Sequence, residues 1–471
     1  MLFSSMIFLW IFLPTVLIVN YFLTVLKISK EKKTELKNGW LLLASLFFYG
    51  WGGIYYLAIM LSVIAVSYAA GILMERTQSD GAHKAVLTAS LAVCLAVLFV
   101  FKYANMVAEM LHAQNWTEIA LPIGISFFTF QAMSYIIDVY RREVPPQKNL
   151  LDFALYVSLF PQLVAGPIVK YSDINEQIAG RDENLEKFYG GQRRFCYGLA
   201  KKVLIANVCA QVADSIWSGD IGNMGAAIAW LGALAYTLQI YYDFSGYSDM
   251  AIGIGRMLGF SFKENFNYPY MSLSVREFWR RWHMSLSGWF RDYVYIPLGG
   301  SRKGMVRTCI NIMIVFALTG IWHGANVTFL LWGMLYGVVL VIERLLKLKD
   351  EGTFSEKLIR YLYTMAVVVL GWILFRSDNI GQAAEYIGQL FKPSNTYMKP
   401  ESYLSMKSII AIAGGIVFMG PAQKITEKYV KKYEDSKLLA TTDLAVQMLL
   451  LAASILMLVS GTYNPFIYFA F

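Results

Sequence analysis

Charged side chains are scarce in this sequence. Asp, Glu, Lys and Arg make up 15% of its 471 residues, whereas soluble domains average about a quarter. Five stretches contain none of these residues: 3–26, 38–74, 85–101, 222–242 and 444–471. A bilayer-spanning helix needs about 20 mostly apolar residues. The composition therefore excludes a disordered chain, a disulfide-stapled secreted module and a nucleic-acid-binding protein, and it predicts a multi-pass membrane protein.

Several chemical motifs are also missing. The four cysteines form no CxxC pair and have no histidine at ligand spacing, so we interpret them as packing residues and predict no metal site. The sequence has neither the glycine-rich lysine loop of nucleotide hydrolases nor a GxSxG nucleophile turn. An ATP-driven pump is therefore unfavoured, and any chemistry must depend on few ionisable groups.

The first basic residues indicate how the chain enters the membrane. None precedes Lys27, and four more lysines follow within ten positions: Lys30, Lys32, Lys33 and Lys37. Because Lys and Arg in short loops mark the cytoplasmic side, we predict an N-terminus outside the cytoplasm. A cleavable signal peptide is unfavoured, since its charged region should come first.

The apolar segments predict an all-α polytopic membrane protein with roughly eleven to thirteen membrane helices at the length a bilayer imposes. Residues 38–74 are too long for one span, and Gly50–Gly53 is suited to a turn between two. Polar or helix-breaking residues interrupt three predicted spans, at 126–131, 161–167 and 243–249. With no large polar segment and no internal repeat, one membrane domain over 1–471 is the simplest organisation, and inverted repeats gain no support.

His323 is the first candidate for catalysis. It lies between the apolar runs 308–318 and 327–342, and an ionisable residue at membrane depth suggests function. Burial favours the neutral imidazole that a general base requires. Gly320 and Gly324 leave room beside it for a close helix or a thin substrate. The alternative is a core histidine bonded to a backbone carbonyl.

Residues 275–295 form a second candidate region, which we interpret as one amphipathic helix. Its apolar stripe comprises Phe278, Trp282, Leu286, Phe290 and Tyr293. The opposite stripe comprises Arg276, Arg280, His283, Ser287 and Arg291. Such a basic face suits the phosphates of an anionic substrate, although an interfacial helix resting on anionic lipid headgroups would have the same pattern.

A third polar feature covers residues 239–249, which place Gln239, Asp243, Ser245 and Asp249 in an apolar context. We favour a hydrogen-bonded polar kink that completes its own network and shapes a cavity. A transporter or flippase is the competing hypothesis, with Asp243 and Asp249 as coupling-ion sites.

Several motifs together resemble the membrane-bound O-acyltransferases, and most closely their bacterial alginate O-acetylation branch. The strongest region is 239–326, with Arg-Trp-His-Met-Ser-Leu-Ser at 281–287 and Gly-Ile-Trp-His-Gly at 320–324. Further likeness extends over 124–135, 160–168, 290–300 and 466–469.

The resemblance implies a multi-helix disc with a central tunnel, with the family's invariant histidine at His323 and its second histidine at His283. Arg276, Arg280 and Arg291 would bind the donor, and the tunnel would be shaped by Gln239, Asp243, Ser245, Trp282, Trp322 and Asn326. The protein would reside in a bacterial cytoplasmic membrane, among lipids, with no bound cofactor. Acetyl-CoA would be the acyl donor.

In such enzymes the acyl group passes from a cytoplasmic thioester to a hydroxyl on an extracytoplasmic polysaccharide or on a serine of an SGNH-type partner protein. The alternative within enzymes is D-alanyl transfer from a carrier protein toward teichoic acid.

Overall fold

The computed structural model describes residues 1–467 except 114–115, 165, 348–351, 394–398, 421, 427–435 and 462. Residues 468 and 469 of the motif at 466–469 therefore lie outside the described part. The described residues form helices and contain no strand, which confirms the predicted all-α class.

The chain divides into two compact units, each made of separate sequence segments. Unit 1 comprises Met1–Phe195 and Tyr247–Glu264, and unit 2 comprises Cys196–Gly246 and Asn265–Phe471. The boundaries fall within helices α9 (Leu185–Ala200) and α11 (Gly225–Met257) and before Asn265. The division into two compact units does not test the prediction of a single membrane domain over 1–471, which stays a prediction.

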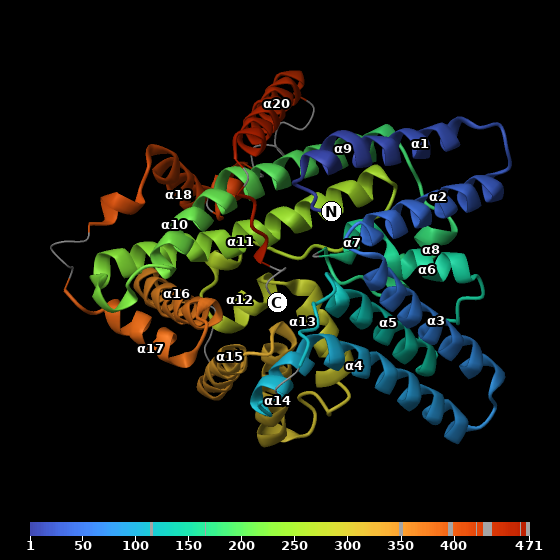
Figure 1. The fold of residues 1–471 in the computed structure, drawn as a ribbon, viewed down its shortest axis with the longest axis horizontal. Helices are drawn as coiled ribbons and strands as arrows, with labels where there is room; N and C mark the ends of the chain where they lie inside the picture. Colours follow the sequence, from blue (N-terminus) through green and yellow to red (C-terminus); the bar gives the residue numbers. More distant parts are fainter. Residues whose placement is uncertain are drawn as a thin grey trace. The chain divides into compact units, whose positions relative to one another are not determined.

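Unit 1 contains η1 and eight complete helices. They are η1 (Phe8–Phe12), α1 (Leu13–Val25), α2 (Lys30–Gly50), α3 (Ile54–Arg76), α4 (Asp80–Met110), α5 (Ile125–Tyr140), α6 (Leu150–Ser158), α7 (Phe160–Leu163) and α8 (Tyr171–Ala179). Helix α5 packs on α3 and α4, and α2 packs on α6 (Figure 1). Helices α2 and α3 meet at Gly50–Gly53, as predicted, and the lysine-rich stretch forms the first turns of α2 and not only a loop.

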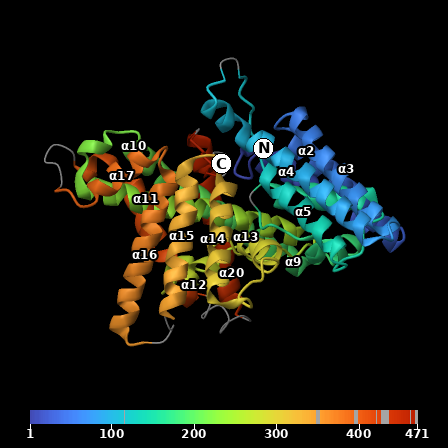
Figure 2. The same ribbon diagram turned by 90° about the horizontal axis from the view of Figure 1, so that it is seen from below.

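Unit 2 contains the remaining helices. They are η2 (Lys201–Ala206), α10 (Asn207–Trp217), η3 (Ile221–Asn223), η4 (Pro269–Met271), α12 (Val275–Arg281), α13 (Met284–Phe290), η5 (Arg291–Tyr295), α14 (Gly304–His323), α15 (Val327–Leu346), α16 (Phe354–Arg376), α17 (Ile380–Gln389), η6 (Pro400–Tyr403), α18 (Met406–Phe418) and α20 (Lys437–Ser460). Helices α14, α15 and α16 stand side by side in Figure 2.

Glycines bring α14 and α15 into backbone contact. A β-carbon added at Gly333 would overlap the carbonyl oxygen of Phe316, and one added at Gly320 would overlap that of Phe329. Small residues at these positions permit the close approach that helix packing in membranes requires. This contact fixes α14, which ends at His323, against α15.

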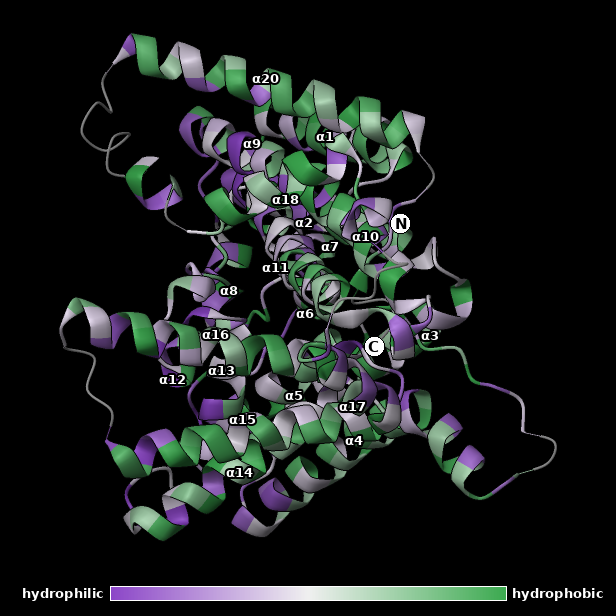
Figure 3. Cartoon of the chain, turned by 90° about the vertical axis from the view of Figure 1, so that its left-hand side faces the viewer, coloured by the Kyte–Doolittle hydropathy of each residue, from purple (hydrophilic) through white to green (hydrophobic). Residues whose placement is uncertain are grey.

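Seven of the described helices are long and apolar enough to cross a membrane: residues Phe8–Val25, α3, α4, α14, α15, α16 and α20. Hydrophobic residues predominate along α20 in Figure 3. This number is below the eleven to thirteen membrane helices expected. Helix α2 begins with a lysine-rich turn and α11 carries Asp243, Asp249 and Arg256, while several other expected spans are shorter helices.

Two predicted interruptions are absent from the structure. Residues 126–131 lie within α5, and residues 243–249 lie within the continuous 33-residue helix α11, so the expected polar kink is wrong. The break near Pro161 is present, because α6 ends at Ser158 and α7 begins at Phe160.

Candidate active site

His323 is the last residue of α14 and is 5% exposed. Helix α15 begins four residues later, at Val327, and the side chain of its N-cap residue Asn326 accepts a hydrogen bond from the Thr328 N–H at 3.1 Å. This N-cap lets α15 start directly after the turn. His323 is therefore held at a short, well-defined hairpin between two membrane helices.

Three aromatic rings surround the His323 imidazole. The ring centroids of Trp322, Trp332 and Phe375 lie 4.8, 5.0 and 5.1 Å from that of His323. They come from α14, α15 and α16, respectively. Gly320 and Gly324 do not leave space for a substrate, because Phe329 of α15 packs against both glycines. Of the two predicted neighbours of these glycines, a close helix or a thin substrate, the structure has the close helix, α15.

His283 interrupts the predicted helix over 275–295. Helix α12 ends at Arg281, and His283 has the left-handed φ of 44° before α13 begins at Met284. The prediction of one continuous amphipathic helix over 275–295 is therefore wrong. Its predicted apolar stripe is nevertheless buried throughout: Phe278, Trp282, Leu286, Phe290 and Tyr293.

A neighbouring segment supports this break. The backbone N–H of Met284 donates to the Asn265 carbonyl, and the Asn267 N–H donates to the Arg281 carbonyl, both at 2.9 Å. The Asn265 side-chain oxygen lies 3.1 Å from Nδ1 of His283. Sequence reasoning missed Asn265, since its 18-residue separation from His283 gives no periodic signal.

His283 is buried among apolar rings. It is 1% exposed, and its ring centroid lies 4.6 Å from that of Phe244 and 6.1 Å from that of Trp322. Burial removes water from the imidazolium and lowers the pKa of His283 from 6.5 to about 3. The ring is therefore neutral at physiological pH.

Trp322 connects the two histidines. Its ring contacts those of both His283 and His323, so the imidazoles are separated by no more than the sum of these two centroid distances. Trp282 packs on Trp372 at 4.8 Å, and Trp372 packs on Phe375 at 5.8 Å. The two predicted catalytic residues thus share one aromatic cluster in unit 2.

The predicted arginine stripe does not share a face with His283. Arg280 and Arg291 are exposed and Arg276 is half-buried, whereas the His283 ring is buried. The left-handed residue between α12 and α13 breaks the periodicity that would align these groups on one continuous helix. Arg291 also forms an ion pair with the adjacent Asp292 at 2.9 Å.

The polar residues of α11 within unit 2 are buried. Asp243 pairs with Lys202 at 2.5 Å and accepts the Ile467 N–H at 2.8 Å. Gln239 Oε1 and Ser245 Oγ have no hydrogen-bond partner among the described residues. Lys202 was missed, although a buried carboxylate at membrane depth signals a basic partner.

Asp249 also has a basic partner, within unit 1. Arg194 contacts it at 2.8 Å and also pairs with Glu264. Because both aspartates of α11 are neutralised by bases, neither has the character of a vacant coupling-ion site.

Glu343 of α15 anchors α12 and was also missed. Its carboxylate is 1% exposed and accepts the N–H groups of Val275 at 2.7 Å and Arg276 at 2.9 Å. A carboxylate satisfies the free donors at a helix N-terminus and complements its dipole. It thereby ties the segment that leads to His283 to the helix that follows His323.

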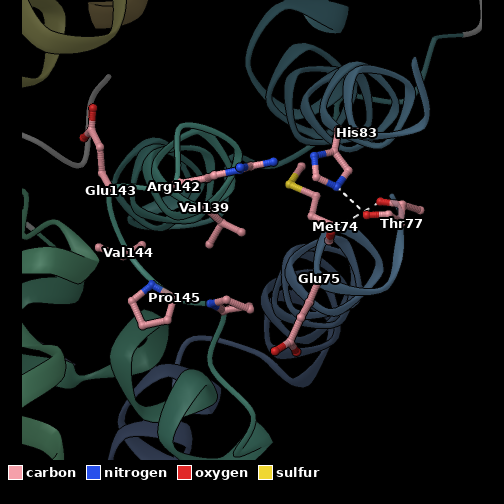
Figure 4. A pocket seen from close by; sticks show the side chains of 10 residues that line it. Met74, Glu75, Thr77, His83, Val139, Arg142, Glu143, Val144 and Pro145 are labelled. Carbon is pink, nitrogen blue, oxygen red and sulfur yellow. Dashed lines mark hydrogen bonds between the residues drawn. The ribbon is translucent and has the colours of Figure 1, made fainter. Parts of the chain in front are cut away.

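A pocket of about 520 Å³ lies in unit 1, where α3 and α5 end and α4 begins (Figure 4). Its lining includes Glu75, His83, Arg142 and Glu143. Nε2 of His83 donates to the Thr77 carbonyl at 2.8 Å, which gives this histidine a structural role. Within the described ranges, no cluster of three or more His, Cys, Asp or Glu side chains is placed to hold a metal.

Comparison with known proteins identifies the family. Residues 139–375, which include both histidines, match the model of the MBOAT, membrane-bound O-acyltransferase family. The "Probable alginate O-acetylase" of Pseudomonas putida is 40% identical over the full length of both chains. The "Peptidoglycan O-acetyltransferase" of Helicobacter pylori is 33% identical over 82% of this chain and 79% of its own.

A more distant relative is the "Teichoic acid D-alanyltransferase" of Streptococcus thermophilus, which is 30% identical over 47% of this chain and 56% of its own. Full-length similarity to the alginate O-acetylases, together with the membrane helices, makes this protein a multi-pass membrane acyltransferase. The chain belongs to the membrane-bound O-acyltransferase family, in the branch of the bacterial alginate O-acetylases.

Proposed function

We propose that the protein transfers an acetyl group from cytoplasmic acetyl-CoA to a hydroxyl on an extracytoplasmic polysaccharide. The observation that carries this proposal is the pair of buried histidines, one between α12 and α13 and one at the end of α14, that contact the same tryptophan. The names of the alginate and peptidoglycan relatives support a polysaccharide acceptor.

In the proposed mechanism His323 is the general base. It removes the proton of the acceptor hydroxyl, the alkoxide attacks the thioester carbonyl, and the tetrahedral intermediate expels the thiolate of CoA. General-base catalysis of this kind contributes about 10²- to 10⁴-fold. The thiolate leaves readily, because a thiol has a pKa of about 8.5. His283 holds or orients a substrate beside this base.

The position of His323 along α14 suits an acceptor from outside the cytoplasm. Basic residues Arg302 and Lys303 precede the helix, and His323 ends it 20 residues later. A helix of this length spans about 30 Å. With the basic loop in the cytoplasm, His323 lies at the opposite end of α14, and the acetyl thioester reaches it through a tunnel.

Polar groups inside unit 2 support such a tunnel. Gln239 Oε1 and Ser245 Oγ are buried without hydrogen-bond partners among the described residues. An unsatisfied buried polar group costs about 1–3 kcal/mol unless water or a substrate completes it. We propose that these residues, with Asp243, Trp282, Trp322 and Asn326, shape the path between donor and acceptor.

The donor's phosphates are proposed to bind the exposed arginines. Arg280 and Arg291 are open to solvent and Arg276 is half-buried, so their charges can reach an anion outside the aromatic cluster. Transfer through a serine of an SGNH-type partner protein is the second route by which acetyl could reach the polymer. D-alanyl transfer ranks lower, because the D-alanyltransferase relative matches only 47% of this chain.

The test compares histidine variants in cells that export an acetylated polymer. His323→Ala and His283→Ala are expected to reduce acetyl ester on the polymer at unchanged amounts of folded enzyme. His112→Asn is the matched control, because this histidine lies two residues beyond the end of α4, in unit 1, and has a left-handed φ of 50° that Asn tolerates. Wild-type acetylation in His323→Ala would refute the proposed base.

A further inference from the structure

We propose that Asn265 is a positioning residue that holds His283 in the tautomer with the proton on Nδ1 and the lone pair on Nε2. This inference rests on the proposed function for the use that catalysis makes of Nε2. The geometry at Asn265 supports the assigned tautomer independently of that function, because both the side chain and the backbone carbonyl of Asn265 contact the segment that holds His283.

The hydrogen bonds identify which atom of the Asn265 amide faces the imidazole. The Ser285 backbone N–H donates to Oδ1 at 3.3 Å, and the Ser285 hydroxyl donates to it at 2.8 Å. A backbone N–H can only donate, so this atom must be the carbonyl oxygen and not the NH₂ group. The histidine nitrogen 3.1 Å from the same oxygen must therefore carry a proton.

Asn265 also fixes the backbone on which His283 sits. Its own carbonyl accepts the Met284 N–H at 2.9 Å, directly after the histidine. A left-handed conformation is energetically unfavourable at a residue other than glycine and needs support from its surroundings. The 1% exposed Asn265 thus holds both the strained backbone of His283 and the orientation of its ring.

The tautomer determines which chemistry His283 can perform. Neutral imidazole has one donor nitrogen and one acceptor nitrogen, and the partner of the first decides the role of the second. With the proton on Nδ1, Nε2 accepts hydrogen bonds and cannot donate one to a carbonyl. His283 therefore recognises an O–H or N–H group, from the attacking hydroxyl or from an amide of the donor's pantetheine arm.

The experiment begins with wild-type enzyme labelled with ¹⁵N-histidine, whose chemical shifts distinguish the two tautomers. The chain has four histidines, so His283→Gln assigns the signal. Since the Ser285 hydroxyl lies 3.4 Å from Nδ1 and could replace the lost acceptor, the perturbation is Asn265→Leu in a Ser285→Ala background. Ser285→Ala alone is the matched control, and Asn265→Asp retains an acceptor oxygen.

We expect wild type, Ser285→Ala and Asn265→Asp to show the Nδ1-protonated ring, and the double variant to lose it. The double variant should lose about 10²- to 10⁴-fold in kcat/KM relative to Ser285→Ala, the range of acid–base assistance, while Asn265→Asp stays within about tenfold of wild type. A raised KM for acetyl-CoA would identify the donor amide as the group recognised; a lowered kcat or raised acceptor KM would identify the hydroxyl.

A wild-type ring protonated on Nε2 would overturn the proposal without any variant. So would a double variant that keeps the tautomer, or one that matches the rate of Ser285→Ala. Failure of the proposed function looks different: His283→Gln would transfer acetyl at the wild-type rate, while the ¹⁵N signals would still report the tautomer that Asn265 selects.

Discussion

The buried ion pair between Lys202 and Asp243 is predicted to contribute to the stability of unit 2, and substitutions at these two residues test this prediction. The two side chains are 2% and 3% exposed, and their charged atoms lie 2.5 Å apart. Lys202 also donates to the Pro465 carbonyl, and its ammonium lies 5.6 Å from the Phe466 ring centroid. Asp243 accepts the Ile467 N–H. The pair therefore also holds residues 465–467.

Removing one charge should cost more than removing both. Lys202→Met leaves Asp243 as an uncompensated buried carboxylate, and breaking a buried pair in this way costs about 3–5 kcal/mol. Lys202→Met combined with Asp243→Asn removes both charges, and the Asn oxygen can still accept the Ile467 N–H. The main remaining loss is the partner of the Pro465 carbonyl, at about 1–3 kcal/mol.

The free energy of unfolding can be measured by titrating SDS into mixed micelles. Lys148→Met is the control, because Lys148 is 76% exposed and its ion pair with Glu75 at 3.0 Å should contribute at most about 1 kcal/mol. The double variant should be more stable than Lys202→Met alone. A Lys202→Met protein as stable as Lys148→Met, or a double variant that loses the sum of both single losses, would contradict this account.

Four further predictions follow from the site and its supports. Gly333→Ala should force α14 and α15 apart and lower the free energy of unfolding by about 1–3 kcal/mol, as overpacking does. Gly414→Ala is the control and should not destabilise the protein, because no atom lies within 4 Å of the added carbon. Because the pKa of His283 falls to about 3 on folding, the unfolded state binds more protons than the folded state below about pH 6.5. Lowering the pH from 7 to 5 should therefore reduce the unfolding free energy of wild type by about 2 kcal/mol more than that of His283→Gln. Equal reductions would refute a neutral buried ring. Arg280→Gln in neutral detergent should raise the KM for acetyl-CoA with kcat nearly unchanged, and an unaltered KM would leave Arg280 as a lipid contact. A cysteine replacing Lys303 should react with an impermeant thiol reagent only after cells are opened, and labelling of intact cells would reverse the proposed orientation.

The sequence was sufficient to single out both histidines of the aromatic cluster. His323 stands out as an ionisable residue between two apolar runs, and His283 as an imidazole within a basic stripe. It also predicted the burial of the apolar stripe in 275–295, because that property follows from three- and four-residue spacing. It did not predict that Trp279, Trp289 and His283 are buried as well. It could not predict the break at His283. The left-handed conformation there is supported by Asn265, whose hydrogen bonds join segments far apart in the chain.

The polar stretch of α11 shows the opposite error. Asp243 and Asp249 suggested an interrupted helix, yet α11 continues through both. Their charges are matched by Lys202 and Arg194 from elsewhere in the chain, so the backbone has no need to unwind. Single-sequence reasoning recognises a buried charge but cannot identify a partner that only the folded chain brings near.

The interleaving of the two units constrains how relatives of this enzyme can be recombined. A chimaera that exchanges one unit intact needs crossovers after Phe195, after Gly246 and after Glu264. The second crossover lies inside α11, between the aspartate that pairs with Lys202 and the one that pairs with Arg194. Exchanging the whole of α11 with one unit would therefore separate Asp243 from Lys202 or Asp249 from Arg194. A recombination point inside the helix, directly after Gly246 and thus three positions after one aspartate and three before the other, should preserve both pairs.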